Sequence, residues 1–405
     1  MFDTLERMKL IMDHFDYGSL GEEKKVNKKK IIICVIIALV IIALITVGTL
    51  YVVREDFRNW VDVHILQKEV TQDDVSTIEF NSDTNVEICA YDRYIGILSK
   101  NSFNIYNSAG KEEKTLEVPI NDVIFNSSGR FLGIAEKGGQ SIYLISGQDI
   151  AWENKIEGSI TNIVVNKNGY MAVVISDTSY KTVVSVYNQT GKELFKIFLA
   201  STKVTDVSIS NDNKYLALAE VDTSSSVIQS NVKIVSIENA QTDVDNSVTY
   251  IFNADQNKLL TSIAYQDKDR LICMYDDSIC SIHNEQSTEI LNFADKKVAF
   301  SSIKLNNCIA TVEEKSSGLF TADSELMVIN TATLKENLYT VHDVAKEVHS
   351  YGDIVGLNLG AELHFINTNG WLVKRYVANQ EISNFVFSDS IAGIIYRDKI
   401  DVLSL

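Results

Sequence analysis

The chain has 405 residues, of which 45% are apolar, so it can bury a large core. Its formal net charge is −17 at pH 7. Residues 1–30 contain seven Lys or Arg and six Asp or Glu, so the acidic excess falls on the rest of the chain. Because an acidic surface repels phosphate polymers and anionic headgroups, nucleic acid is a poor candidate partner.

The first predicted element is a transmembrane helix at residues 31–53. This stretch holds no charged residue, and as a helix it would span roughly 34 Å, which is enough to cross the hydrocarbon core of a bilayer. Five lysines precede it within residues 24–30, whereas Arg54 and Arg58 follow it among acidic residues. The positive-inside rule therefore predicts a single-pass protein of the cell membrane with its N-terminus in the cytoplasm.

The predicted organisation has four parts: a cytoplasmic tail (1–30), the transmembrane helix (31–53), a juxtamembrane linker (54–74) and an extracytoplasmic domain (75–405).

A repeat runs through the extracytoplasmic domain. A short apolar run recurs, usually with a small second residue, and these second positions are Gly96, Gly133, Ala172, Ala217, Ile272, Ala310, Gly356 and Gly393. Their spacing of 37 to 55 residues is typical of the four-stranded blade of a β-propeller. Polar turns before and after each run complete four strands. We interpret the small residues as positions where inner strands of neighbouring blades approach each other.

The eight repeats predict an all-β propeller of eight four-stranded blades, with seven as the alternative. The last repeat ends at Leu405 after three strands, and residues 75–80 form an isolated β-prone segment before the first repeat. If this segment supplies the missing outer strand, the two ends of the domain share a blade. Such closure removes exposed sheet edges that would invite aggregation.

One face of the predicted ring carries the longest loops. In an antiparallel blade, the turns between strands two and three share a face with the connections between blades. The longest insertions there are residues 222–231 and 314–323, with a smaller one at residues 177–181. We take Tyr180, Gln229 and Phe320 in these loops as candidate contact residues. Glu136, Glu220 and Glu313 each follow a repeat position by three residues near the same mouth, where they are either a site for a cation or an amine or solvated strand ends.

The sequence contains no recognised catalytic, metal-binding or phosphate-binding motif, so no catalytic residue, metal or cofactor is predicted. Cys273 and Cys280 would lie opposite each other if Asp276 and Asp277 form a two-residue turn. They are therefore either a cross-strand disulfide or two buried thiols.

The chain resembles a family of bacterial single-pass membrane proteins known as a domain of unknown function. The resemblance rests on the lysine-flanked helix and on several segments in order: residues 57–62, 65–70, 152–154, 179–183 and 228–234. Such a family implies no activity. The Asn-x-x-Gly-Lys turns also resemble those of quinone-cofactor and WD-repeat propellers, at the level of fold alone.

Two functions remain open at this point. In the first, the domain is a platform that binds a protein or cell-envelope ligand on its loop-bearing face. In the second, it is a cell-surface enzyme, a glycan-acting hydrolase or lyase, with its site in the central mouth. The absence of a catalytic constellation favours the platform.

Overall fold

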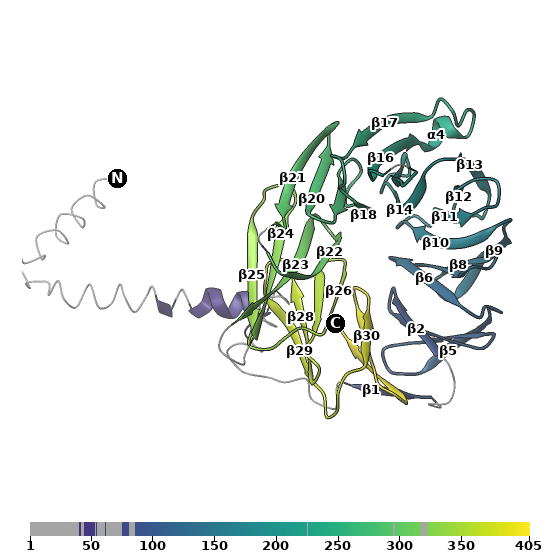
Figure 1. The fold of residues 1–405 in the computed structure, drawn as a ribbon. Coiled ribbons are helices and arrows are strands. Elements are labelled where there is room, and N and C mark those ends of the chain that lie inside the picture. The colour runs from purple at the N-terminus through teal and green to yellow at the C-terminus, as the bar shows by residue number, and fades with distance from the viewer. Residues whose placement is uncertain are drawn as a thin grey trace, which may run out of the picture. The chain divides into compact units, whose positions relative to one another are not determined.

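The computed structural model describes residues 40–41, 44–52, 54, 61, 75–80, 86–224, 226–294, 296–316 and 322–405. The chain divides into two compact units, Met1–Arg58 and Asn59–Leu405 (Figure 1).

The N-terminal unit is described only in part. Residues 40–41 and 44–52 are helical, and apolar side chains such as Leu44 and Val52 are exposed. Within the described residues, no helix is both long and apolar enough to cross a membrane. The predicted tail, most of the predicted linker and half of the predicted transmembrane helix lie outside the described residues.

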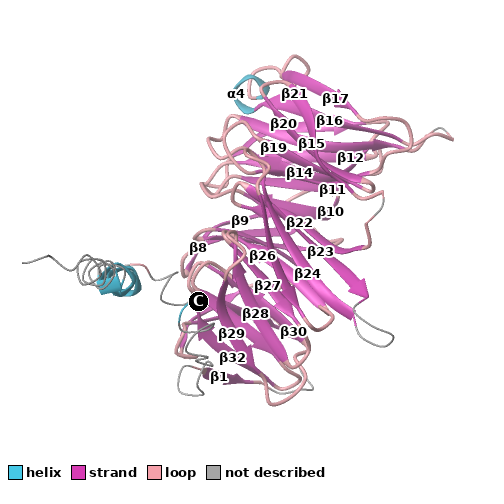
Figure 2. Cartoon of the chain, turned by 90° about the vertical axis from the view of Figure 1, so that its left-hand side faces the viewer, coloured by secondary structure: helices cyan, strands magenta, loops and turns pink. Residues whose placement is uncertain are grey.

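The second unit is a ring of eight four-stranded antiparallel sheets in the described part of the chain, as predicted (Figures 1 and 2). Blades one to four are formed in chain order by β2 (Val86–Tyr91), β3 (Tyr94–Ser99), β4 (Ser102–Tyr106), β5 (Glu112–Glu117); β6 (Val123–Ser128), β7 (Phe131–Glu136), β8 (Ser141–Ser146), β9 (Asp149–Lys155); β10 (Ser159–Val165), β11 (Met171–Ser176), β12 (Thr182–Tyr187), β13 (Glu193–Leu199); and β14 (Lys203–Ile209), β15 (Tyr215–Asp222), β16 (Gln229–Ser236), β17 (Val248–Asn253). A short helix, α4 (Ile237–Ala240), precedes β17.

Blades five to eight continue the pattern. They contain β18 (Leu260–Tyr265), β19 (Leu271–Tyr275), β20 (Ser278–His283), β21 (Gln286–Asn292); β22 (Val298–Leu305), β23 (Cys308–Ser316), β24 (Ala322–Asn330), β25 (Glu336–Val341); β26 (Glu347–Tyr351), β27 (Ile354–Asn358), β28 (Glu362–Asn367), β29 (Leu372–Val377); and β30 (Asn384–Phe387), β31 (Ile391–Ile395), β32 (Lys399–Ser404), β1 (Ser76–Glu79).

The closing strand lies where the sequence predicts it. β1 pairs antiparallel with β32, and Ile78 is opposite Ile400. The eighth blade is therefore assembled from both ends of the domain, so the ring is closed by backbone hydrogen bonds between segments far apart in the sequence.

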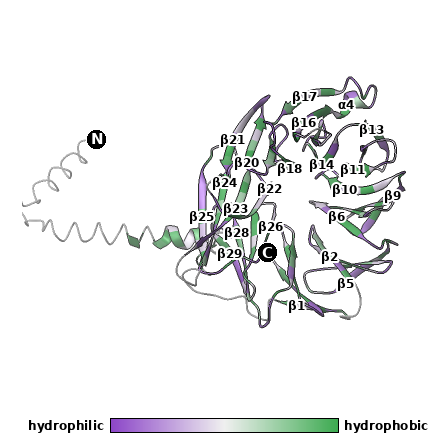
Figure 3. Cartoon of the chain, in the orientation of Figure 1, coloured by the Kyte–Doolittle hydropathy of each residue, from purple (hydrophilic) through white to green (hydrophobic). Residues whose placement is uncertain are grey.

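The core is divided among the blade interfaces. Each of the eight interfaces contains one cluster of buried apolar side chains, contributed by the facing sheets of two neighbouring blades. Figure 3 shows hydrophobic residues along the strands of the blades. The second strand of a blade is covered on both faces by the neighbouring blades. Such strands are therefore nearly continuous apolar runs, as in β11 (Met171–Ser176).

Two glycines of the repeat have a different role from the one predicted. A Cβ atom at Gly133 would lie 2.7 Å from Cγ2 of Val165 in the next blade. One at Gly96 would lie 2.3 Å from Cζ of Phe103 in its own blade. The missing side chain thus makes room for a large apolar side chain, and close approach of two backbones is not what requires glycine there.

Blade seven contains a buried imidazole. Nε2 of His364 is 3.0 Å from a carboxylate oxygen of Glu362, and Nδ1 is 3.1 Å from the hydroxyl of Tyr339. Arg375 donates two hydrogen bonds to Glu362, which lower the pKa of that carboxyl group. Burial lowers the pKa of His364, although the neighbouring carboxylate opposes this effect.

We expect the stability of the domain to fall as the pH is lowered from about 6.5, where an unfolded histidine titrates. Below that pH the unfolded chain binds a proton that the folded His364 site binds less readily, so the free energy of unfolding decreases. Urea unfolding at several pH values tests this. His364→Gln should flatten the dependence, whereas His342→Gln, at a side chain that is 90% exposed, should not. If the free energy of unfolding changed equally with pH in the wild type and in His364→Gln, the prediction would be contradicted.

Candidate functional site

The two faces of the ring differ in what they carry. The turns between strands two and three hydrogen-bond to the connections between blades. In blade five, the amide of Asp276 donates to the carbonyl of Leu259, and the amide of Phe293 donates to the carbonyl of Asp277. We call this side, which contains residues 177–181, 223–224 and 226–228, the loop face. The opposite side, which contains the turns between strands one and two, is the turn face.

The predicted long insertions are partly strand. β15 and β16 pair from Tyr215–Ser236 up to Asp222–Gln229, and β23 and β24 pair up to Ser316–Ala322. The ends of both predicted insertions therefore continue the antiparallel ladder, whereas residues 223–224 and 226–228 are not strand and residues 317–321 lie outside the described residues. Both hairpins extend on the loop face.

An exposed aromatic pair lies on the loop face of blade three. Tyr180 is in the turn before β12, and Phe198 is near the end of β13. Their ring centroids are 4.9 Å apart, yet 38% of Tyr180 and 53% of Phe198 remain exposed. Phe198 is turned outward because its neighbours Ile197 and Leu199 are buried in the interface with blade four.

The next blade in the ring, blade four, carries the long hairpin of β15 and β16. Hydrogen bonds from Ser224 lower the pKa of Asp222, and the positive charge of Lys181 acts in the same direction. Asp222 is paired across the strands with Gln229. Of the predicted contact residues, Tyr180 and Gln229 both lie on the loop face, in neighbouring blades.

Gln229 is occupied by the fold. Its side-chain amide donates to the carbonyl of Ala254 at 3.0 Å, so it joins β16 to the segment that follows β17. The third predicted contact residue, Phe320, lies outside the described residues.

The three predicted glutamates do not form a joint site. Glu220 is only 2% exposed, and its carboxylate lies 2.6 Å from Nζ of Lys233 on the neighbouring strand. Glu313 pairs with Lys296 at 3.4 Å, and Glu136 is partly buried at the end of β7. They lie in blades two, four and six, and among the described residues no group of three or more acidic, His or Cys side chains is arranged to hold a metal.

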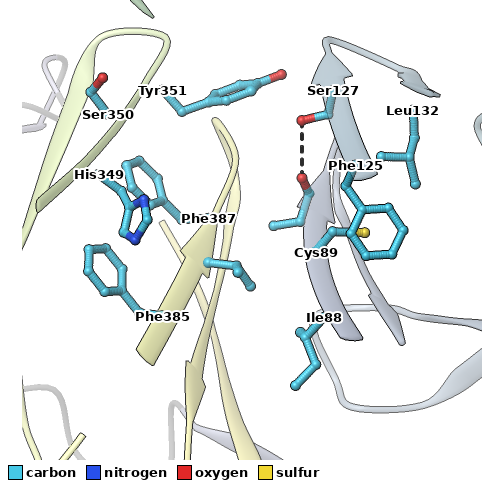
Figure 4. Close-up of a pocket in the computed structure, with 12 residues that line it drawn as sticks. Ile88, Cys89, Phe125, Ser127, Leu132, His349, Ser350, Tyr351, Phe385 and Phe387 are labelled. Carbon is cyan, nitrogen blue, oxygen red and sulfur yellow. Dashed lines mark hydrogen bonds between the residues drawn. The ribbon is translucent and has the colours of Figure 1, made fainter. Parts of the chain in front are cut away.

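A second feature is a pocket in the centre of the ring. Its volume is about 280 Å³. The inner strands β2, β6, β26 and β30 of four successive blades provide most of its lining: Ile88, Cys89, Ala90, Phe125, Ser127, Leu132, His349, Ser350, Tyr351, Phe385, Val386 and Phe387 (Figure 4). Eight of the twelve lining residues are apolar, and two serines, a tyrosine and a histidine add hydroxyl and imidazole groups.

Tyr351 makes a hydrogen bond to a blade that is not its neighbour, on the turn face. Its hydroxyl accepts a hydrogen bond of 2.9 Å from the amide of Gly129, although blades seven and two are not neighbours in the ring. The amide of Asp92 donates to the carbonyl of the same glycine. These bonds hold the turns of three blades together.

The lining of this pocket offers little for hydrolysis. None of its twelve residues is Asp or Glu, so it contains no carboxylate pair for glycoside cleavage. Burial strongly raises the pKa of the Cys89 thiol, which keeps it protonated and a poor nucleophile. His349 packs edge-on against Phe385, with 4.7 Å between centroids, and bonds to Glu347.

The cysteine hairpin has the predicted register. Cys273 is directly opposite Cys280, and the turn between them is formed by Asp276 and Asp277. Both are free thiols in the structure, and burial strongly raises the pKa of Cys273. The cross-strand disulfide stays a prediction for oxidising conditions.

These features define the class of protein: an eight-bladed β-propeller whose loop face carries extended hairpins and an exposed aromatic pair. The chain belongs to the Family of unknown function (DUF5711), whose model matches residues 67–405. A comparison with curated proteins gives no match.

Solved structures with a similar fold include BamB from Moraxella catarrhalis, at 10% identity, a TM-score of 0.50, and coverage of 84% of this chain and 99% of that one. Apo AztD from Citrobacter koseri matches at 10% identity and a TM-score of 0.48, over 79% of this chain and 89% of that one. The Cps50 (Swd1) β-propeller domain from Myceliophteria thermophila matches at 12% identity and a TM-score of 0.44, over 82% of this chain and 99% of that one. At these identities, the likeness to BamB shows the propeller fold and nothing about function.

Proposed function

We propose that this protein is a membrane-anchored, extracytoplasmic platform that holds a protein or cell-envelope ligand on the loop face of its propeller. The observation that carries the proposal is the exposed pair of Tyr180 and Phe198. Exposed aromatic side chains are enriched at the centres of protein interfaces, because burial of a large rigid ring on binding is favourable at a small entropic cost.

The surroundings of the pair suit an interface. Charged groups flank it, since Lys181 follows Tyr180 and Asp222 lies on the hairpin of the neighbouring blade. An apolar centre with a polar, solvated rim is the usual organisation of a binding surface. The two extended hairpins of blades four and six provide further area on the same face.

The proposed location rests on the sequence of residues 31–53. Their lack of charge and the lysines before them favour a single membrane crossing with the propeller outside the cytoplasm. In that arrangement the platform would meet proteins and polymers of the cell envelope.

Proximity labelling in intact cells tests the proposal. The labelling enzyme is fused to the C-terminus of the full chain and supplied with a membrane-impermeant substrate. We expect a specific partner to be labelled by the wild type and to lose about tenfold in yield in the variant Tyr180→Ala, Phe198→Ala, because interface aromatics dominate binding energy.

The matched control is Trp371→Ala. Trp371 is 41% exposed and lies in the turn between β28 and β29, which is on the turn face. Its replacement should leave labelling unchanged. A partner equally labelled by all three proteins would remove the aromatic pair from the interface, and the absence of any label outside the cell would contradict the proposed topology.

A further inference from the structure

The outer strand of blade four differs from those of the other blades. An outer strand has one unpaired edge, and proteins commonly protect such edges with charged side chains that prevent pairing with another chain. Among the eight outer strands that the structure describes, seven contain at least one charged residue: β1, β5, β9, β13, β21, β25 and β29. β17, with the sequence VTYIFN, contains none.

β17 is also unusually exposed. Five of its six residues are exposed, including Val248, Tyr250 and Ile251 at 38%, 41% and 52%. One edge of β17 pairs with β16, and no described strand pairs with the other. Valine, threonine, tyrosine, isoleucine and phenylalanine are strong strand formers, so this edge is suited to receive a further strand.

Acidic residues lie at both ends of this strand. Asp243 and Asp245 precede it and Asp255 follows it, and all three are exposed. Glu285, in a turn of blade five, accepts a hydrogen bond from the hydroxyl of Tyr250. The uncharged strand therefore lies in an acidic surrounding, and an antiparallel partner would bring its own two ends close to these carboxylates.

We propose that β17 is a docking edge for an extended segment of a partner protein that has alternating apolar side chains in its centre and Lys or Arg at its ends. Backbone hydrogen bonds to the free edge supply affinity, side chains that pack beside Ile251 and Tyr250 supply selectivity, and the acidic flanks select basic ends. A second copy of this chain fits less well, because antiparallel pairing of two β17 strands would place Asp245 near Asp255 of the other copy. The docking edge does not depend on the function proposed for the loop face.

The test uses the full chain in detergent. Random displayed peptides of about nine residues, the length of an ordinary strand with its flanks, are selected for binding. The expected peptides alternate apolar and polar residues and carry basic ends, and they protect the amides of β17 from hydrogen exchange. Ile251→Lys should weaken their binding about tenfold, which corresponds to about 1.4 kcal/mol. Leu338→Lys, at a residue 54% exposed on the outer strand of blade six, should not.

Several results would overturn the proposal: selected peptides that bind Ile251→Lys as well as the wild type, peptides with acidic ends, or peptides that leave β17 exchange unchanged. A dimer of the full chain that is lost in Ile251→Lys would make a second copy the occupant instead. Hydrogen exchange in the wild type is informative even if a variant fails to fold. Peptide binding should persist in the variant Tyr180→Ala, Phe198→Ala, so failure of the platform proposal is distinguishable from failure of this one.

Discussion

Ile78→Ala is expected to lower the free energy of unfolding by about 2–4 kcal/mol, the range for loss of a large buried aliphatic side chain. β1 is only four residues long, and Ile78 is its one fully buried residue, at 5% exposure. Its side chain packs with Ile400 and Val402 of β32 and with Ile95 of blade one. The substitution therefore weakens the strand that closes the ring.

Loss of closure has a second consequence that a simple core cavity would not have. When β1 detaches, the edge of β32 becomes free, so amide exchange in β30, β31 and β32 should accelerate before the rest of the ring unfolds. Thr77 adds to the closure, because its hydroxyl donates a 2.8 Å hydrogen bond to Asp401, a carboxylate that also accepts from Tyr376 of blade seven.

Chemical unfolding of the full chain, followed by hydrogen exchange, measures both effects. Glu79→Ala on the same strand is the control, since Glu79 is exposed and its loss should change stability by less than about 0.5 kcal/mol. If Ile78→Ala and Glu79→Ala were equally stable, β1 would not hold the ring closed.

Gly356→Ala is expected to lower the free energy of unfolding by about 1–3 kcal/mol, the usual penalty for overpacking a core. A Cβ atom there would lie 2.5 Å from Cε2 and 3.0 Å from Cζ of Phe385. That ring has little room to move, because it stacks on Phe387 with 5.9 Å between centroids and meets Phe365 and His349 edge-on.

The same substitution should affect the central pocket. Phe385 and Phe387 both line it, so displacement of the Phe385 ring changes its shape (Figure 4). Binding of a small aromatic probe such as indole, measured by calorimetry, should therefore differ between the wild type and Gly356→Ala.

A second substitution distinguishes this clash from a general effect of the added methyl group. In the double variant Gly356→Ala, Phe385→Leu the smaller side chain leaves space for the new Cβ atom. The double variant should then lose less free energy of unfolding than the two single variants lose in sum, because the effects of substitutions at contacting residues are commonly not additive. Strict additivity would mean that the Phe385 ring does not limit this position.

Much of the fold could be predicted because its signals are local. The repeated apolar run with a small second residue identified the second strand of each blade, and the polar turns identified its neighbours. The closing strand could be inferred by counting strands. The last repeat has only three, and the isolated β segment before the first repeat supplies the fourth. The paired positions of Cys273 and Cys280 followed from a two-residue turn alone.

The candidate site was predicted less well. Tyr180 was identified from its loop, but Phe198 was not, although alternation along β13 places it on the face opposite Phe195 and Ile197. Glu220 was taken for a possible site residue because its neighbour across the strand was unknown. The register places Ala219 opposite Val232 and Glu220 opposite Asn231, which leaves Lys233 close enough for an ion pair.

The sequence by itself indicated the strand repeat, the strand that closes the ring, and eight blades with seven as the alternative, because each depends on periodicity, turn chemistry and a count of strands. The structure decided for eight blades. Only the tertiary structure decided which side chains meet: Tyr180 with Phe198, Glu220 with Lys233, and Gly356 with Phe385. The lack of charge in β17 is visible in the sequence, but its meaning depends on the topology that makes it an outer strand. The physical reason is that strand propensity acts along the chain, whereas register and blade packing depend on contacts between distant residues.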